Sequence, residues 1–199
     1  MAISDEDVRL FTPRDIDLDA AEDAARALLV ALGFDLGDSS LRDTPRRVAN
    51  AFGEFLAPEP FTATTFHNDR EYDELVLVRD VPFHSLCEHH MLPFKGVAHV
   101  AYLPGERIVG LSKLARVVEH FARDLQVQER LTKQIADWLD TTLSPRGVGV
   151  VLEAEHLCMS LRGVQKTGAR TVTSALYGRL RDDQRTRQEF LSLTGGRRA

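Results

Sequence analysis

Val97-Ala98-His99-Val100-Ala101-Tyr102 is rich in residues that favour strands, and Pro104-Gly105 supplies a turn directly behind it. The residues that follow change to helical spacing, in two apolar stripes that are out of phase around 125–128. The stripes are Leu114, Val118, Phe121 and Leu125, then Leu131, Ile135, Trp138 and Leu139. We therefore expect this strand to be followed by two helices or by one bent helix.

Further strands are expected on both sides of this region. They lie at 75–78, 149–153 and 171–177, with a short extended piece at 108–110 and a terminal helix at 185–193. Helices gathered between the second and third strands predict an α+β domain, with a mainly antiparallel four-stranded sheet and helices on one face. One helical layer leaves strand edges exposed, and pairing of those edges between copies predicts a symmetric oligomer.

A helical extension is expected before the sheet. The apolar positions of 18–32 recur at helical spacing, and Thr44-Pro45 starts a second helix, with Thr44 as its N-cap. Prolines at 58 and 60 end that helix. We therefore expect an N-terminal arm with helices over residues 1–60 and a main domain over residues 61–199, with residues 1–17 loosely held.

Composition narrows the class of protein. The chain has 199 residues and a formal net charge of -5, so it does not attract nucleic acid as a whole, and any anion site must be a local cluster of Arg and Lys. No apolar run approaches the roughly 20 residues that span a bilayer. The acidic N-terminus lacks a signal-peptide core, and we expect a cytoplasmic location.

The chemistry of the chain is concentrated in two short motifs, Cys87-Glu88-His89-His90 and His156-Leu157-Cys158. They contain both cysteines of the chain, and Cys and His are preferred ligands of Zn²⁺. Cys87, His90 and Cys158 would leave one position of a tetrahedral metal open, as catalytic zinc sites do. The alternatives are a closed site with His156 as a fourth ligand, or a pair of plain buried thiols.

Two histidines remain outside this ligand set. His89 and His90 are neighbours and diverge, so one can bind metal while the other transfers protons. His156 and Cys158 point to the same side if this segment is extended. Zinc lowers the pKa of bound water to about 7, and imidazole titrates in the same range.

Polar residues near helix starts indicate where an anion could bind. Ser112-Lys113 opens a helix, where backbone N–H groups and the Lys charge favour a phosphate. Further basic residues fall near expected element ends, where the alternative is a solvated face: Arg46, Arg47, Arg116, Arg162 and Lys166. Glu129 can accept two hydrogen bonds from a guanine edge, or can be an ordinary charge on a helix surface. No P-loop pattern is present.

Taken together, the motifs closely resemble the GTP cyclohydrolase I family. The resemblance runs from about Ala20 to about Leu193 and rests on several motifs in order. They are Ser85-Leu86-Cys87-Glu88-His89-His90, Gly110-Leu111-Ser112-Lys113-Leu114-Ala115-Arg116, Gln126-Val127-Gln128-Glu129-Arg130-Leu131-Thr132, His156-Leu157-Cys158 and Arg162-Gly163-Val164-Gln165-Lys166.

The resemblance implies a reaction and an assembly. Members convert GTP and water to 7,8-dihydroneopterin triphosphate and formate, the first step toward tetrahydrofolate-type pterins. Their fold is the tunnelling fold, a four-stranded antiparallel sheet with two helices. Two pentameric rings form a homodecamer with sites between subunits, and regulation by an effector stays open. No nucleic acid or membrane partner is implied.

The resemblance also assigns residues by matching position. It implies Zn²⁺ on Cys87, His90 and Cys158. His156 would protonate N7 of the guanine, with His89 assisting later proton transfers and Ser112 close to the ribose. The implied substrate-binding residues are Gln128 and Glu129 for guanine, and Lys113, Arg116, Arg162 and Arg47 for the triphosphate. Glu88 is expected to hydrogen-bond a ligand.

Two residues differ from the family pattern, and two other classes of protein compete with this interpretation. Asp124 and Asn50 stand where many relatives carry Arg and Lys, which places an acid near the guanine end and removes one phosphate contact. A sister enzyme that reduces a nitrile with a nicotinamide cofactor uses a lone nucleophilic Cys, and the double cysteine–histidine set argues against it. A non-catalytic GTP-binding or zinc-stabilised protein would not need His89 and His156.

Overall fold

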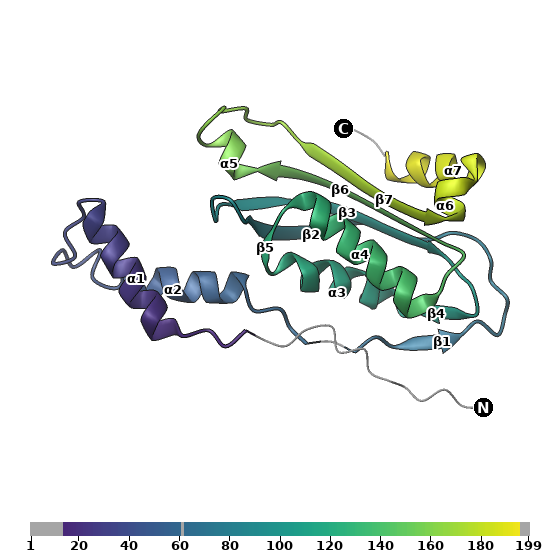
Figure 1. The fold of residues 1–199 in the computed structure, drawn as a ribbon, viewed down its shortest axis with the longest axis horizontal. Helices are drawn as coiled ribbons and strands as arrows, with labels where there is room; N and C mark the ends of the chain where they lie inside the picture. Colours follow the sequence, from purple (N-terminus) through teal and green to yellow (C-terminus); the bar gives the residue numbers. More distant parts are fainter. Residues whose placement is uncertain (1–13, 61, 196–199) are drawn as a thin grey trace.

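The computed structural model describes residues 14–60 and 62–195, and the expected loose arm lies mostly outside this range. Figure 1 shows a twisted sheet with helices packed on it and a helical pair at the N-terminal side. The main sheet has five strands in the order β5-β2-β3-β6-β7. The long ones are β2 (Val76–Cys87), β3 (Pro93–Leu103), β6 (Gly147–His156) and β7 (Thr171–Gly178).

The α+β class is confirmed, while the sheet differs from the expected four antiparallel strands. Neighbouring long strands are antiparallel throughout. The fifth strand, β5 (Leu125–Gln126), pairs in parallel with Leu86 and Cys87 at the end of β2. It occupies the point where the two helical stripes lose phase, so the phase break marks a short strand between two helices.

The helices α3 (Leu111–Ala122) and α4 (Gln128–Leu143) cover one face of the sheet. Their apolar stripes meet the alternate strand residues that point to the same side, and side chains of both layers are fully buried. Examples are Leu114, Val118, Ile135 and Leu139 from the helices and Ala98, Val100, Val150 and Leu152 from the strands.

The C-terminal helices correct the expectation that all helices lie on one face. In α6 (Arg179–Asp182) and α7 (Gln184–Thr194), Leu180 and Phe190 are fully buried in a second cluster. That cluster contains Ala101 and Val151, which point to the other side of β3 and β6. Strand alternation therefore supplies apolar residues to both faces at this end of the sheet.

The N-terminal helices α1 (Leu18–Ala31) and α2 (Thr44–Phe55) pack on each other. Asp17 caps α1, whereas the N-cap of α2 is Asp43, one residue before the expected Thr44. The pair reaches the main sheet through the ring of Phe55, which lies 5.5 Å from that of His84. The division of the chain at residue 60 stays a prediction.

The remaining elements are short. Strand β1 (Thr65–His67) pairs with β4 (Arg107–Val109) in a separate two-stranded sheet, so the extended piece at 108–110 is outside the main sheet. The one-turn helix α5 (Leu157–Ser160) follows β6. Strand β2 continues nine residues past the expected Val78, through an irregularity between Val78 and Val81, and this extension carries the chain to Cys87. None of the described helices is long and apolar enough to cross a membrane.

Candidate active site

The first two candidate ligands lie in the tight turn between β2 and β3. The backbone N–H of Cys87 donates to the carbonyl of Leu92 at 2.9 Å, and the N–H groups of His90 and Met91 donate back to the carbonyl of Cys87. Met91 has a positive φ of 55°, which closes the turn. This geometry fixes the Cys-x-x-His spacing, and Sγ of Cys87 lies 3.9 Å from Nδ1 of His90.

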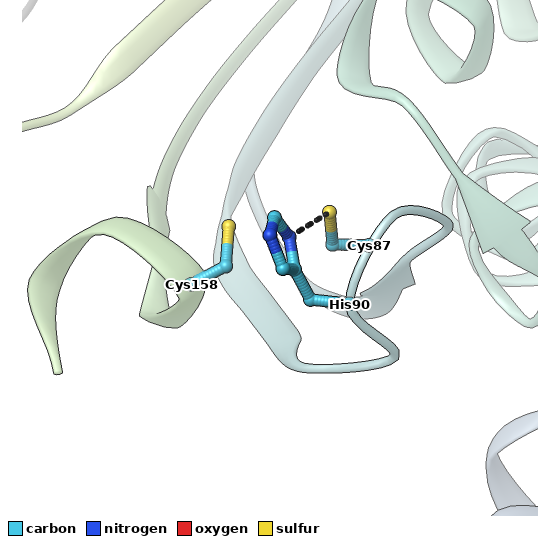
Figure 2. Close-up of side chains that lie close together, drawn as sticks. All are labelled: Cys87, His90 and Cys158. Carbon is cyan, nitrogen blue, oxygen red and sulfur yellow. Dashed lines mark hydrogen bonds between the residues drawn. The ribbon is translucent and has the colours of Figure 1, made fainter. Parts of the chain in front are cut away.

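The third candidate ligand comes from a different element. Strand β6 ends at His156, and Cys158 lies in α5. The segment 156–158 is therefore not extended, which was the condition for His156 and Cys158 to point to the same side. The turn of helix nevertheless brings Cys158 to the β2–β3 turn, as Figure 2 shows. The ligand atoms of Cys87, His90 and Cys158 all lie within 4.8 Å of one another. Both cysteines are buried and free.

This donor set suits a zinc ion. Two thiolates and one imidazole are ligands that zinc accepts, at about 2.3 Å for sulfur and about 2.0–2.1 Å for nitrogen. Burial, followed by the neighbouring Cys87, raises the pKa of the Cys158 thiol, so a metal must displace its proton on binding. His156 is outside the group of three that the described residues form, which disfavours the closed four-ligand site.

His156 lies beside the metal group on a rigid support. Its ring stacks on Phe94 with centroids 4.5 Å apart and planes 4° from parallel. Its Nε2 is 2.8 Å from Oε1 of Gln128. Burial lowers the pKa of His156, and the charge of Glu129 opposes that shift. Glu129 therefore acts electrostatically on His156, from an exposed position at the start of α4.

His89 lies in the same turn as Cys87 and His90 and is exposed. Its Nδ1 is 3.8 Å from Sγ of Cys87, and its Nε2 is 3.8 Å from Glu88. The carboxylate of Glu88 pairs with Arg130 at 2.7 Å, so its contacts are with Arg130 and His89, not with the ligands as expected.

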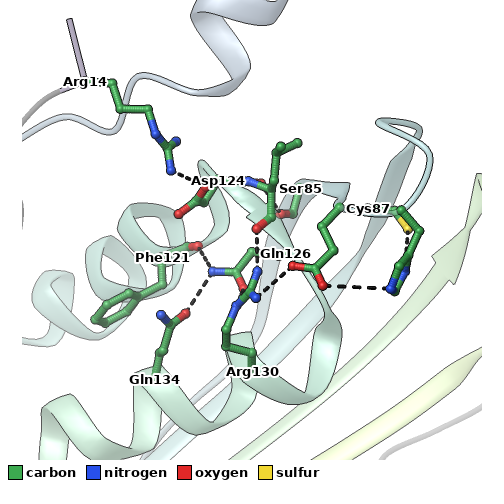
Figure 3. A network of polar contacts seen from close by, with 11 residues as sticks. Arg14, Ser85, Cys87, Phe121, Asp124, Gln126, Arg130 and Gln134 are labelled. Atoms are coloured by element: carbon green, nitrogen blue, oxygen red, sulfur yellow. Dashed lines mark hydrogen bonds and ion pairs between the residues drawn. The ribbon is translucent and has the colours of Figure 1, made fainter.

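A polar network around Arg130 and Gln126 joins the β2–β3 turn to α3 and α4 (Figure 3). The guanidinium of Arg130 donates to the side chain of Gln126 at 2.9 Å and to the carbonyl of Leu125 at 2.5 Å. The amide of Gln126, almost fully buried, donates to Phe121 and Gln134. Figure 3 also shows Asp124, which pairs with Arg14 at 2.6 Å.

The expected phosphate-binding residues fall into separate places. Arg162 is close to the metal group, because its guanidinium donates to the carbonyl of Cys158 at 3.4 Å. Ser112 and Lys113 begin α3, whose other end leads into β5 beside Cys87. From Ser112 to the end of α3 at Ala122 the helix axis rises about 15 Å.

Arg116 and Arg47 are also away from the metal group. Arg116 lines a cavity of about 750 Å³, together with polar side chains on or next to the sheet, including His84, Lys95, Glu155 and Arg170. Arg47 is exposed in the first turn of α2 and pairs with Asp43 at 3.5 Å. The contacts given for the described residues thus link His89 to Cys87, and Gln128 and Glu129 to His156, and they show no such link from Ser112, Arg116 or Arg47.

Sequence reasoning missed several residues that shape the site. Phe94 supports His156, Arg130 holds Glu88, and Thr132 and Thr173 contact Gln128 or each other. Phe94 is separated by 62 positions from His156 and meets it only through the pairing of β3 with β6. A periodic pattern in one segment does not carry such a contact, whereas the Cys-x-x-His spacing is local.

The fold and the site together define a mixed α+β protein with a candidate metal centre that has two histidines beside it. The model of the GTP cyclohydrolase I family matches residues 21–195. The chain belongs to this family, a family of hydrolases.

Individual relatives agree with this assignment. A GTP cyclohydrolase 1 from Aquifex aeolicus is 51% identical over 91% of this chain and 98% of its own length. Another, from Streptomyces coelicolor, is 54% identical over 90% of this chain and 91% of its own. A solved structure of the archaeosine synthase QueF-Like in the apo form covers 52% of this chain and 93% of its own, with a TM-score of 0.44 and 15% identity, too slight a likeness to support a conclusion.

Proposed function

We propose that this protein is a zinc-dependent enzyme that converts GTP and water to 7,8-dihydroneopterin triphosphate and formate. The observation that carries the proposal is the group of Cys87, His90 and Cys158 with His89 and His156 left outside it, in a chain that belongs to the GTP cyclohydrolase I family. Three ligands leave room for a reacting group, and two free imidazoles supply proton transfer.

The reaction needs a nucleophile at C8 of guanine and a proton for the departing ring nitrogen. Zinc bound by the three ligands would activate water and polarise the reacting centre. His156, held flat on Phe94, would deliver the proton to N7. His89, on the exposed side of the turn, would assist the later proton transfers that release formate. Glu129 would accept hydrogen bonds from the guanine edge.

The triphosphate needs cations that a single chain does not bring to the metal. Arg162 lies beside Cys158, while Lys113 and Arg116 lie along α3 and Arg47 on α2. We propose that Ser112, Lys113, Arg116 and Arg47 reach the metal group of another copy, in a decamer of tunnelling-fold subunits. Arginine suits this role because its forked donors match phosphate oxygens.

The biological setting is proposed on family membership. The product would enter tetrahydrofolate or related pterin synthesis, in the cytoplasm. These two statements stay predictions, as does any allosteric control.

A product assay tests the function directly. Zinc-loaded protein is incubated with GTP, and formate is measured together with the fluorescent pterin that appears after oxidation. The proposal expects both products in equal amounts. Release of inorganic phosphate without formate would replace it with a GTPase, and GTP binding without any product would replace it with a non-catalytic protein.

A further inference from the structure

The side chain of Gln128 is fully engaged inside the protein. It is 1% exposed, and its Nε2 lies 3.1 Å from the carbonyl oxygen of Leu152 and 3.0 Å from that of Thr171. A third acceptor, Oγ1 of Thr173, is 3.1 Å away. The remaining polar atom, Oε1, is 2.8 Å from Nε2 of His156. Every polar atom of this amide therefore has a protein partner.

These neighbours fix which end of the amide faces which group. A carbonyl oxygen only accepts hydrogen bonds, so the atom facing Leu152 and Thr171 must be the nitrogen. The flipped amide would place an oxygen about 3 Å from two other oxygens, with no hydrogen between them. The amide orientation is thus determined by backbone carbonyls of β6 and β7.

The hydroxyl groups of two threonines next to Gln128 also have defined hydrogen-bond directions. Oγ1 of Thr132 lies 2.7 Å from the carbonyl of Gln128, to which it must donate. Since its one hydrogen is used there, Oγ1 of Thr173, 2.6 Å away, donates to Thr132. Thr173 then keeps its lone pairs for the amide of Gln128. The donors and acceptors among Gln128, Thr132 and Thr173 can therefore be assigned in only one way.

The consequence falls on His156. Because Oε1 of Gln128 accepts, Nε2 of His156 must carry a hydrogen, and the ring is also held by its stack on Phe94. We propose that Gln128, oriented by the carbonyls of Leu152 and Thr171 with support from Thr173, is a positioning residue that fixes the ring orientation and the Nε2–H tautomer of His156. Nδ1 is then the ring nitrogen that exchanges a proton with the substrate.

This inference rests on the proposed function and changes one expected role within it. The resemblance places Gln128 among the guanine-binding residues. With its amide saturated by the protein, the side chain of Gln128 acts on the substrate through His156, and Glu129 is the remaining candidate for recognition of guanine.

Kinetics of four variants test the proposal. Gln128→Met keeps the length of the side chain and removes both amide atoms, and kcat should fall about tenfold or more with KM for GTP nearly unchanged. Thr173→Val should give a smaller fall in kcat, and Thr173→Ser should restore it. Thr141→Val is the matched control, because the Thr141 hydroxyl donates to the carbonyls of Asp137 and Trp138 within α4 and has no printed contact with Gln128, and its kcat should equal that of the wild type.

The double variant Gln128→Met/Thr173→Val shows whether Thr173 affects kcat through Gln128 or independently of it. Thr173 acts through Gln128, so the double variant should be no slower than Gln128→Met alone. Zinc content should stay at the wild-type level in every variant. A raised KM with unchanged kcat in Gln128→Met would overturn the proposal in favour of direct substrate binding, and additive losses would overturn the path through Thr173.

A spectroscopic measurement tests the tautomer of His156 independently of the proposed function. Solid-state ¹⁵N NMR of histidine-labelled, zinc-loaded protein without nucleotide reports which ring nitrogen carries the hydrogen, with the His156 signal assigned by its loss in His156→Asn. The wild type should show hydrogen on Nε2, and Gln128→Met a mixture. Hydrogen on Nδ1 in the wild type would refute the tautomer even if formate is released. Absence of formate would refute the function while leaving the tautomer tested.

Discussion

Cys158 completes the metal group from α5, while Cys87 and His90 come from the β2–β3 turn. A metal held by all three would tie the two segments together. Removing one ligand leaves two, which bind zinc far more weakly.

Cys158→Ala should therefore lose stoichiometric zinc and activity together. The measurement is metal content after dialysis against a weak chelator, by atomic emission. Met159→Ala, at the exposed neighbour on the same turn of helix, is the control and should keep its zinc. Full zinc content in Cys158→Ala would remove Cys158 from the ligand set.

Glu88 has a supporting position between Arg130 and His89. Glu88→Gln should weaken the ion pair with Arg130 and loosen His89, because the distances of 2.7 Å and 3.8 Å both depend on the carboxylate. We expect kcat to fall about twofold to fivefold, with zinc content unchanged, since exposed ion pairs contribute up to about 1 kcal/mol. The control is Arg26→Met, which breaks a surface pair in α1. Equal kcat in the two variants would contradict a role for Glu88.

His99 links stability to pH. It is 5% exposed, and its Nδ1 accepts a hydrogen bond from the backbone N–H of Asp80 at 3.2 Å. Burial lowers the pKa of His99, with Asp80 and Glu153 acting to raise it and Arg79 to lower it. The folded protein therefore binds a proton at His99 less readily than the unfolded chain does. This contribution to stability is present above the ordinary pKa of about 6.5 and is lost as the pH falls toward the folded pKa.

The variant His99→Asn tests this linkage, because Asn retains an acceptor and does not titrate. Between about pH 8 and about pH 5.5, the wild type should lose more thermal stability than His99→Asn. The readout is the difference in unfolding temperature between the two proteins across that range. A constant difference would mean that His99 does not titrate in the folding equilibrium.

At the scale of residues, the local motifs could be predicted from the sequence, whereas the residues that hold them in place could not. The Cys-x-x-His spacing identified Cys87 and His90, and the second Cys–His motif identified Cys158. The partners Phe94, Arg130 and Thr173 belong to other strands and helices and are set by tertiary pairing. The expected contact of Glu88 with a ligand was wrong, because Arg130 was not recognised as its partner.

At the scale of elements, periodicity predicted both helices of the main layer and the α+β class. It underestimated β2, where exposed Asp80 with a φ of 58° and Pro82 interrupt the apolar alternation that usually marks a strand. The two-residue strand β5 was not predicted, since its length leaves no pattern. The position of α7 on the opposite face depends on the burial of Phe190 against the far side of the sheet, which no pattern within one helix reveals.

At Gly96, the pairing of two strands leaves no room for a side chain. It lies where β3 pairs with β6, and a Cβ there would stand 1.9 Å from the carbonyl oxygen of Glu153. Gly96→Ala should push the two strands apart and destabilise the protein by about 2–4 kcal/mol. Urea unfolding measures the loss.

Gly110→Ala is the control for this substitution, because its nearest atom would be 3.9 Å away and its φ of -59° suits alanine. As the N-cap of α3 it should cost no more than about 1 kcal/mol, less than Gly96→Ala. If the two alanine variants unfold at the same urea concentration, the close approach of β3 and β6 at Gly96 is not real.

At the scale of the whole molecule, the chain separates groups that the proposed reaction needs together. The metal group lies at one end of α3, and Ser112 and Lys113 lie at the other. Copies that share sites can complement one another's defects. Cys158→Ala and Lys113→Met are each expected to be inactive alone, and co-expression of the two should restore part of the activity, because some mixed sites contain neither change.

The control for complementation is a mixture of Cys158→Ala with Cys87→Ala, two changes in the same metal group. Each metal group in that mixture carries one change or the other, so no activity should return. Recovery in both mixtures, or in neither, would contradict sites shared between copies.

The central claim is that Cys87, His90 and Cys158 hold the one zinc ion that turnover of GTP requires. The most direct measurement titrates metal-free protein with zinc and follows formate released from GTP. We expect no formate without zinc, a linear rise as zinc is added, and a plateau at one zinc per chain. Full formate release before zinc is added, or none at one equivalent, would contradict it.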